Sequence, residues 1–351
     1  MFLSIRDLRF AKGRFALMSS ALFLISLMVV MLSGLTTGLG NQSIAAVQHI
    51  GADNFAFGEP AEGQSLSFGE STVTEQQRDA LAATAGVDEA AIVGIAPVRI
   101  SNGSREVAAS AFGVDGDSFA APVPLDAGSA AVDADLAKDN GWDAGSRITI
   151  GAQTFTITAL VDDSLYSHQP VVWIDHGVWT QLPSAGGSDG TVVALRTSGG
   201  FDADGAAAAT GTSITDQKGA LDAIGSYTSE RGSLLLMQAM LMTVSALVVG
   251  AFFTVWTIQR SQDLAVLKAV GASTKYLLKD ALGQSLIVLV LGALAAAGLG
   301  AIASQFVPFT LTLTGTLVPF VALIVMGMVG ATAALARIVS IDPQSALATA
   351  R

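Results

Sequence analysis

The stretch QRSQDLAVLKAVGAST, residues 259–274, decides how the chain is organised, because it is a short charged segment between two long uncharged runs. The runs, 234–258 and 281–303, each exceed the roughly 20 apolar residues that a helix needs to cross a bilayer. Windows 15–39 and 317–336 are uncharged and apolar over a similar length. The sequence therefore predicts a membrane protein with four transmembrane α-helices.

Composition supports this class. Of the 351 residues, 51% are hydrophobic and 13% are charged, and the mean hydropathy is +0.56. An ordinary soluble domain has about a quarter of its residues charged.

Charge is distributed unevenly along the chain. Residues 40–230 carry 25 acidic and 7 basic side chains. Lysine and arginine near span ends mark the cytoplasmic side of a membrane. We therefore expect both termini and the 259–280 link inside the cell, residues 40–230 outside it, and the chain in the plasma membrane. The basic residues that support this topology are Arg6, Arg9, Lys12, Arg14, Arg260, Lys268, Lys275, Lys279, Arg337 and Arg351.

The segment between the first two spans shows a mixed pattern. Alternating or apolar runs bounded by Gly, Asp and Pro predict strands, and Thr74 is a candidate N-cap for a helix over 74–85. We expect an α+β extracytoplasmic domain. The strands are expected at 90–100, 105–114, 146–150, 153–161, 169–174 and 191–197, and further helices at 131–140 and 216–229.

The start of the chain has two interpretations. A cleaved signal peptide would have an apolar core of about 7–15 residues and a small-residue cleavage site, whereas this run is longer and lacks that site, which favours an anchor. Arg6, Arg9 and Lys12 lie opposite Phe2, Ile5 and Leu8, which predicts an amphipathic helix on the inner membrane surface. The predicted boundaries are 1–14 elbow helix, 15–39 first span, 40–230 outer domain, 231–258 second span, 259–276 coupling helix, 277–304 third span, 305–316 outer loop, 317–338 fourth span and 339–351 cytoplasmic tail.

No catalytic or metal-binding pattern is found. His49, His168 and His176 lack the spacing of a metal site and are expected to be satisfied or solvent-facing histidines. The stretch GGSDG, 186–190, matches G-x-S-x-G but lacks a preceding strand and a following helix, so a loop is expected. No phosphate-binding loop occurs, so any energy that the protein uses must arrive through another chain, or else it uses none. We predict a non-enzymatic subunit without an intrinsic cofactor and without a nucleic-acid partner.

The charged link predicts a short helix. Ser261 can cap it and Gly271 can end it in a left-handed conformation. Leu264, Leu267 and Val270 repeat every third residue and form a narrow apolar ridge. Such a ridge suits a groove on a partner protein. A helix lying flat on lipid headgroups remains the alternative.

The link and three other segments carry a family resemblance. TIQRSQDLAVLKAVGASTKYL (257–277) resembles the signature of FtsX/MacB-type ABC transporter permeases, and ARIVSIDPQSAL (336–347) resembles the family's ending. IRDLRFAKGRFALMSS (5–20) is similar to its elbow helix, and AVDADLAKDNGWDAGSRITIGAQTFTITALVDD (131–163) to its outer core domain.

The resemblance implies an assembly of two permeases and two ATPase subunits in the lipid bilayer. The link would be a coupling helix seated in a groove of the ATPase, and ATP-driven movement inside would be transmitted to the outer domains without a through-pore. The residues that match the coupling motif are Asp263, Leu264, Val266, Leu267, Lys268, Gly271 and Ala272.

A homodimer has one local signal. Gly34 and Gly38 form a G-x-x-x-G pattern, which lets helices approach closely. Packing of the first span within its own chain explains the pattern equally well.

The cargo interpretation also rests on resemblance. Four spans with one compact outer domain resemble the haem-exporting permeases of Gram-positive bacteria. Haem would load near the outer ends of the first two spans, where methionine can ligate iron and arginine can pair with a propionate. Ordinary apolar packing of the same side chains is the alternative. The candidates are Phe55 and Phe57 as stacking surfaces, Glu59 as an oxygen ligand, and Tyr227, Arg231, Met237, Gln238 and Met240.

Two functions therefore remain open. In the first, the chain is the permease of an exporter of haem or a similar hydrophobic molecule. In the second, it is a mechanical transducer that regulates a cell-wall hydrolase or releases lipoproteins and moves no small molecule.

Overall fold

The computed structural model describes residues 12–103, 105–259, 266, 270–303 and 313–339. The chain divides into two compact units. The membrane unit consists of Met1–Gly38 and Gly232–Arg351, and the outer unit is Leu39–Arg231. The two units are described separately below. The predicted elbow helix up to residue 11 and the tail from residue 340 lie outside the described residues.

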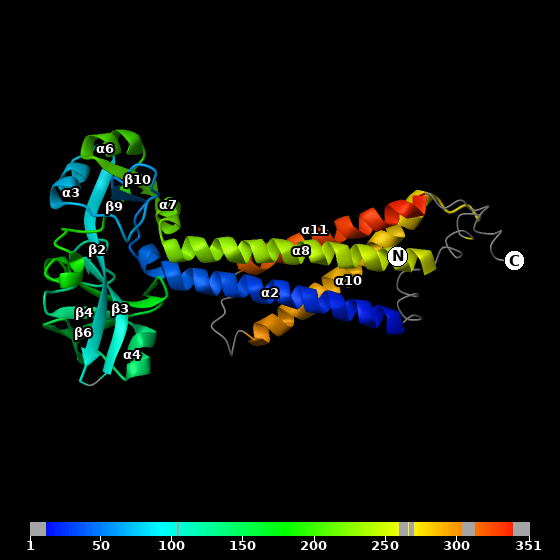
Figure 1. The fold of residues 1–351 in the computed structure, drawn as a ribbon, viewed down its shortest axis with the longest axis horizontal. Helices are drawn as coiled ribbons and strands as arrows, with labels where there is room; N and C mark the ends of the chain where they lie inside the picture. The colour runs from blue at the N-terminus through cyan, green and yellow to red at the C-terminus, as the bar shows by residue number, and fades with distance from the viewer. Residues whose placement is uncertain (1–11, 104, 260–265, 267–269, 304–312, 340–351) are drawn as a thin grey trace. The chain divides into compact units, whose positions relative to one another are not determined.

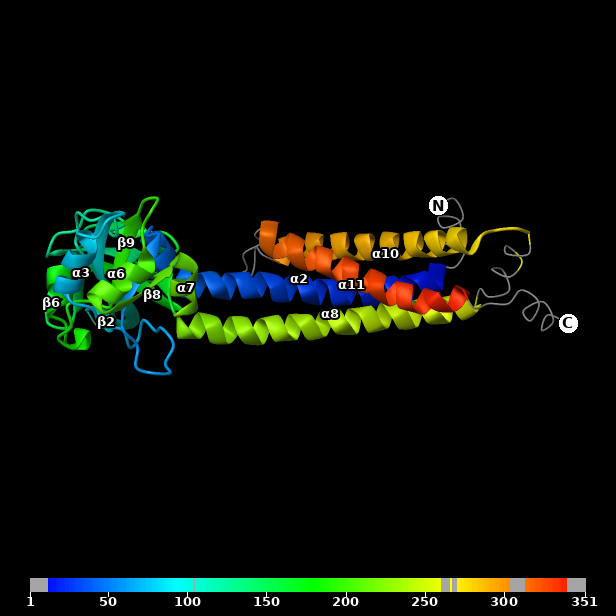
Figure 2. The same ribbon diagram turned by 90° about the horizontal axis from the view of Figure 1, so that it is seen from above.

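Four long helices supply the membrane unit (Figures 1 and 2). They are α2 (Lys12–His49), α8 (Gly225–Gln259), α10 (Thr274–Ala303) and α11 (Leu313–Val339). The first three contain stretches long and apolar enough to cross a membrane, and α11 has a shorter apolar stretch, Leu317–Ala333. The prediction of a four-helix membrane protein is confirmed, with three long spans and a shorter fourth.

Small residues allow the helices of the membrane unit to pack closely. A Cβ placed on Gly330 of α11 would collide with the backbone carbonyl of Ala246 on α8, and Gly250 faces Gly330 one turn along. The side chain of Leu289 on α10 similarly fills the space beside Gly327. Small residues at helix interfaces are typical of membrane bundles, because dispersion contacts replace the hydrophobic driving force there.

The outer unit is built on a mixed β-sheet with the strand order β10-β1-β9-β2-β3-β8-β4-β6-β5. An additional pairing of β5 with β2 closes the β2-β3-β8-β4-β6-β5 part into a ring, and the long strand β2 continues into the open part (Figure 1). The strands are β1 (Asn54–Gly58), β2 (Val87–Asn102), β3 (Arg105–Val114), β4 (Ser129–Asp133), β5 (Arg147–Ile150), β6 (Gln153–Val161), β7 (Leu165–Tyr166), β8 (Gln169–Asp175), β9 (Val192–Thr197) and β10 (Thr212–Asp216).

Short helices pack against both the open and the closed part of the sheet. Thr74 is the N-cap of helix α3 (Glu75–Ala82), as predicted. Its hydroxyl accepts from the Gln77 N–H, and the Gln77 side chain accepts from the Thr74 N–H, which together form a capping box. The other short helices are α4 (Ala134–Asn140), α5 (His176–Trp179), α6 (Ala203–Thr210) and α7 (Gln217–Asp222), with a 3-10 turn, η1, at Pro183–Ala185.

All six predicted strands are present, and the α+β prediction is confirmed. Two helix predictions are corrected: 131–140 begins in strand β4, and 216–229 is divided between the end of β10, α7 and the start of α8. Strands β1, β4 and β10 were missed because each has only five residues and lies beside helical sequence.

Candidate functional site

The link between α8 and α10 is described only at its end. The Val270 N–H donates to the Val266 carbonyl at 3.0 Å, an α-helical bond. Gly271 follows with a φ of 106°, as expected for a glycine that ends a helical turn. Val266 is 50% exposed and Val270 84%. The described end of the link therefore presents apolar side chains to its surroundings.

The start of α10 is fixed by a cap. The Ser273 hydroxyl accepts from the Tyr276 N–H at 3.2 Å, which satisfies one of the unpaired donors at the helix start. Ala272 lies between this cap and Gly271 and is partly buried. The other coupling candidates, Asp263, Leu264, Leu267 and Lys268, lie outside the described residues.

Phe55 and Phe57 are part of the core, which corrects their predicted role as stacking surfaces. Both lie on β1, between β9 and β10, and both are fully buried. Strand side chains alternate between faces, so Ala56 points to the opposite side and joins a second core cluster. Enclosed phenylalanine rings cannot stack on a ligand.

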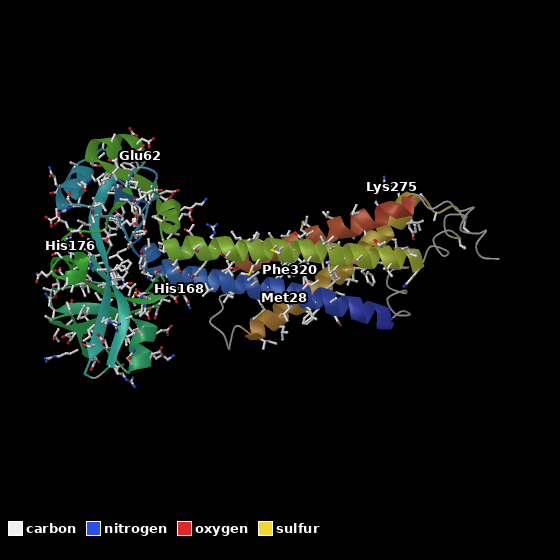
Figure 3. All side chains as sticks on the ribbon, in the orientation of Figure 1. Met28, Glu62, His168, His176, Lys275 and Phe320 are labelled. Carbon is white, nitrogen blue, oxygen red and sulfur yellow. The ribbon has the colours of Figure 1, made fainter. Side chains whose placement is uncertain are left out.

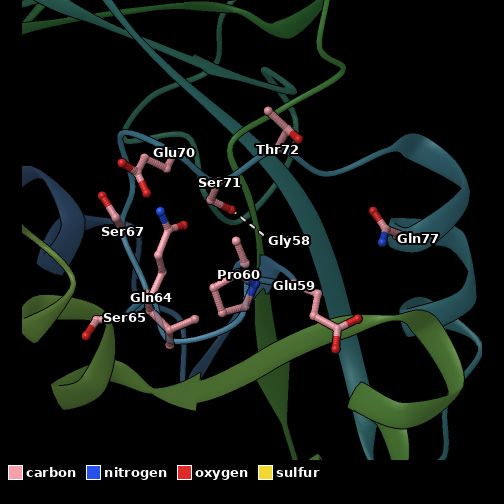
Figure 4. Close-up of a pocket in the computed structure, with 12 residues that line it drawn as sticks. Gly58, Glu59, Pro60, Gln64, Ser65, Ser67, Glu70, Ser71, Thr72 and Gln77 are labelled. Atoms are coloured by element: carbon pink, nitrogen blue, oxygen red, sulfur yellow. Dashed lines mark hydrogen bonds between the residues drawn. The ribbon is translucent and has the colours of Figure 1, made fainter.

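Glu59 is one of the residues that line a polar cavity of 310 Å³ in the outer unit (Figure 4). Hydroxyl, amide and carboxylate side chains line it, among them Gln64, Glu70 and Ser71. The Ser71 hydroxyl accepts from the Gly58 N–H at 2.9 Å and donates to the Thr191 carbonyl at 2.7 Å. Phe55 and Phe57 do not line the cavity with Glu59, so the predicted 54–59 group is not brought together.

Tyr227 and Arg231 form a small cluster in the outer unit. The Arg231 guanidinium lies 3.4 Å from the Asp222 carboxylate and 5.7 Å from the centre of the Tyr227 ring. Both charged side chains are nearly half exposed. Arg231 therefore already has an anionic partner, which a ligand carboxylate would have to compete with.

The three remaining candidates on α8 do not share a face. Met237 and Met240 are 48% and 63% exposed, whereas Gln238 is buried. Gln238 and Met240 are two residues apart, and about 200° of helical rotation separates their directions. The two methionines lie on an exposed apolar face with Leu236 and Val244, and Gln238 points away from it.

Gly34 and Gly38 are both buried within the single chain. This favours packing within the chain, the alternative that the sequence left open. The glycine contacts that join helices in the membrane unit were missed, although the spacing of Gly327 and Gly330 in MGMVGATAALA was a usable signal.

Two histidines are satisfied by protein partners, as predicted. The His176 Nε2 lies 2.6 Å from the Asp189 carbonyl, and its ring is buried. The His168 Nε2 lies 2.8 Å from the Glu230 carboxylate and 3.1 Å from the Ser43 hydroxyl. Within the described residues, no three His, Asp or Glu side chains gather as a metal site would require. The GGSDG stretch is a loop leading into β9.

Burial changes the acidity of two groups in the outer unit. Desolvation raises the pKa of the Asp133 carboxyl above its usual value, although the N–H groups of Leu136 and Ser164 donate to it. Burial also raises the pKa of the Tyr166 hydroxyl. Asp133 joins α4 to the chain after β6, which is a structural role.

The chain is similar to known permeases. Residues 219–343 match the FtsX-like permease C-terminal domain. A Staphylococcus haemolyticus protein named "Putative hemin transport system permease protein HrtB" is 23% identical over 99% of both chains. An uncharacterized ABC transporter permease of Mycobacterium tuberculosis is 26% identical over 98% of both.

Part of the chain is similar to solved structures. The periplasmic region of MacB from Actinobacillus actinomycetemcomitans aligns with a TM-score of 0.38 and 10% identity, over 49% of this chain and 92% of that one. The sequence matches give an FtsX-like permease domain over residues 219–343, in a chain that is similar over nearly its full length to ABC transporter permeases.

Proposed function

We propose that the chain is the permease subunit of an ABC exporter that expels haem, or a similar flat hydrophobic molecule, from the membrane. The observation that carries this proposal is the exposure of Met237 and Met240 within one turn of α8. Methionine adapts its shape to flat apolar guests and can ligate haem iron. The full-length similarity to proteins named as hemin transport permeases supports the same cargo class.

A separate ATPase subunit drives the proposed cycle, in an assembly with two copies of each chain. Val266 and Val270 offer apolar side chains to a groove on that subunit, and Gly271 ends the helical turn beside them. The concentration of lysine and arginine in the link and at both chain ends supports a cytoplasmic position for these segments, with the outer unit outside the cell.

A hemin titration of the purified full chain in detergent, followed by Soret absorbance, tests the cargo. Met237→Leu and Met240→Leu remove the thioether at nearly constant volume. Met242→Leu is the matched control, because Met242 packs against a buried cluster inside the membrane unit. We expect saturable binding of one hemin per dimer, weakened by about fivefold or more in one of the first two variants, which is roughly 1 kcal/mol.

Two results contradict the cargo proposal. The first is an absence of saturable binding by a correctly folded chain. The second is equal weakening by all three methionine variants. Either result would favour the mechanical transducer without a small-molecule cargo.

A further inference from the structure

The turn between β7 and β8 has an unusual backbone. Leu165 pairs with Pro170 and Tyr166 with Gln169, which leaves a two-residue loop of Ser167 and His168. Both loop residues have positive φ, 50° and 63°. This is the pattern of a type I′ turn, which favours Asn-Gly because most side chains are strained at positive φ. A Ser-His loop therefore needs outside contacts to hold it.

The loop backbone is held by the end of α2. The Ser167 N–H donates to the Ser43 carbonyl at 3.1 Å, and the His168 N–H donates to the Gln42 carbonyl at 3.2 Å. Both donors are free to point outward because a two-residue hairpin leaves its central N–H groups unpaired within the ladder. The α2 residues belong to the outer unit.

The loop side chains contact the start of α8. The Ser167 and Ser226 hydroxyl oxygens are 2.9 Å apart. His168 Nε2 lies 2.8 Å and 2.9 Å from the two Glu230 oxygens and 3.1 Å from the Ser43 hydroxyl. His168 thus lies between two helices that both continue into the membrane unit (Figure 3).

This cluster does not have catalytic geometry. In a serine–histidine–carboxylate triad, the hydroxyl and the carboxylate bind different ring nitrogens. Here Ser43 and Glu230 both approach Nε2, so the ring cannot relay a proton from the hydroxyl to the carboxylate.

We propose that the loop and its partners form a releasable latch, made of Ser167, His168, Ser43, Ser226 and Glu230. His168 is a positioning residue in it: its side chain holds α2 and α8 together, and its contacts to both helices break during the transport cycle. The strained turn relaxes when its contacts break. The His168 and Glu230 side chains are 30% and 38% exposed, so water can replace their bond. The loop therefore has two arrangements, one with its contacts to α2 and α8 formed and one with them broken, and an element with two arrangements can act as a switch. The inference rests on the proposed function only for the coupling to an ATPase.

The chain has no cysteine, so engineered pairs report on the latch directly. Ser167→Cys with Ser226→Cys places two thiols across it. Thr149→Cys with Thr154→Cys is the control, because these residues pair across β5 and β6 with hydroxyls 3.4 Å apart. Disulfide formation is measured in membranes that hold the full chain and its ATPase subunit, without nucleotide and after trapping with ATP and orthovanadate.

We expect the 167–226 disulfide to form readily without nucleotide and at least about fivefold more slowly in the trapped state, while the control pair is unaffected. Equal rates in both states, or no disulfide in either, would overturn the proposal. Hemin binding is measured in a separate experiment, so a failure of the chain to bind hemin would not change the interpretation of the cross-linking rates.

A second variant separates stability from switching. Ser167→Asn with His168→Gly gives the preferred turn sequence and removes the side-chain contacts to α8. We expect the thermal midpoint of this variant to be unchanged or higher. The switching is measured with a second cysteine pair, Gln42→Cys with Ser226→Cys, as the ratio of its cross-linking rates without nucleotide and after orthovanadate trapping. We expect this orthovanadate effect to fall at least fivefold in the variant. His49→Gly, at an exposed histidine near the end of α2, is the control. An unchanged orthovanadate effect in the Asn-Gly variant would contradict the latch.

Discussion

The outer unit and the membrane unit bury their apolar side chains to different extents. In the outer unit, Trp173, Phe112 and many strand residues are fully buried within one chain. In the membrane unit, the most apolar window of α8 is only 22% buried, and Leu236, Met240 and Leu247 are more than 60% exposed. The outer unit completes its own core. The membrane unit leaves apolar faces for lipid or protein neighbours, and its internal contacts depend on small residues.

The largest expected effect is on the self-contained core. Trp179 is buried, and its ring lies over Gly94 and Gly113 on neighbouring strands, where any Cβ would collide with it. Trp179→Ala should cost about 3–5 kcal/mol, since the cavity cannot close completely. The measurement is the thermal midpoint of the full chain in detergent. Leu160→Ala, at a 43% exposed position on β6, is the control. Equal shifts would show that the outer core is not tightly packed.

An intermediate effect is expected in the membrane unit. Gly330→Ala places a methyl group against the Ala246 carbonyl and should cost about 1–3 kcal/mol through displacement of α11 from α8. Gly298→Ala is the matched control, because nothing lies within 4 Å of its Cβ position. The thermal midpoints of both variants test the comparison. A control that loses as much stability as Gly330→Ala would show that helix packing is not the cause.

The smallest effect depends on pH. Asp133 accepts from the Leu136 and Ser164 N–H groups, and burial raises its pKa. The folded state therefore binds this proton more tightly than the unfolded state, so the protonation-linked stability is present below pH ~4 and is lost as the pH rises through the raised folded pKa.

Asp133→Asn should remove this pH dependence and lower stability by about 1 kcal/mol, because the NH2 group that replaces Oδ2 cannot accept from the Ser164 N–H. The difference in thermal midpoint between parent and variant is measured from about pH 4 to about pH 7, since a carboxyl group with a raised pKa titrates above its ordinary range. A parent advantage that grows with rising pH would contradict the raised pKa.

Sequence patterns were most successful where local physics dominates. Thr74 predicted a helix N-cap, and Gly271 predicted a helix end, because both depend on a few adjacent residues. The candidate site was less predictable. Phe55 and Phe57 looked like interfacial aromatics, but β1 is inserted between β9 and β10, whose paired residues are about 140 and about 160 positions away in sequence. Only that pairing decides that their rings are enclosed.

The latch shows the same limit. His168 has no motif partner in the sequence, and Ser-His is not a favoured pair for a type I′ turn. Its partners, Ser43 and Glu230, lie 125 and 62 positions away. No local signal could have selected them, since the contact exists only once the hairpin has been placed between the two helices.

The sequence by itself determined the four apolar helices, the acidic domain between the first two, and the charged link with its glycine end. These follow from helix length, hydropathy and local backbone preference, which are properties of contiguous residues. The tertiary structure decided which glycines join helices, which aromatic rings are buried, and where His168 finds its partners. Those outcomes depend on contacts between distant segments, whose energies are expressed only after the strands have paired and the helices have packed.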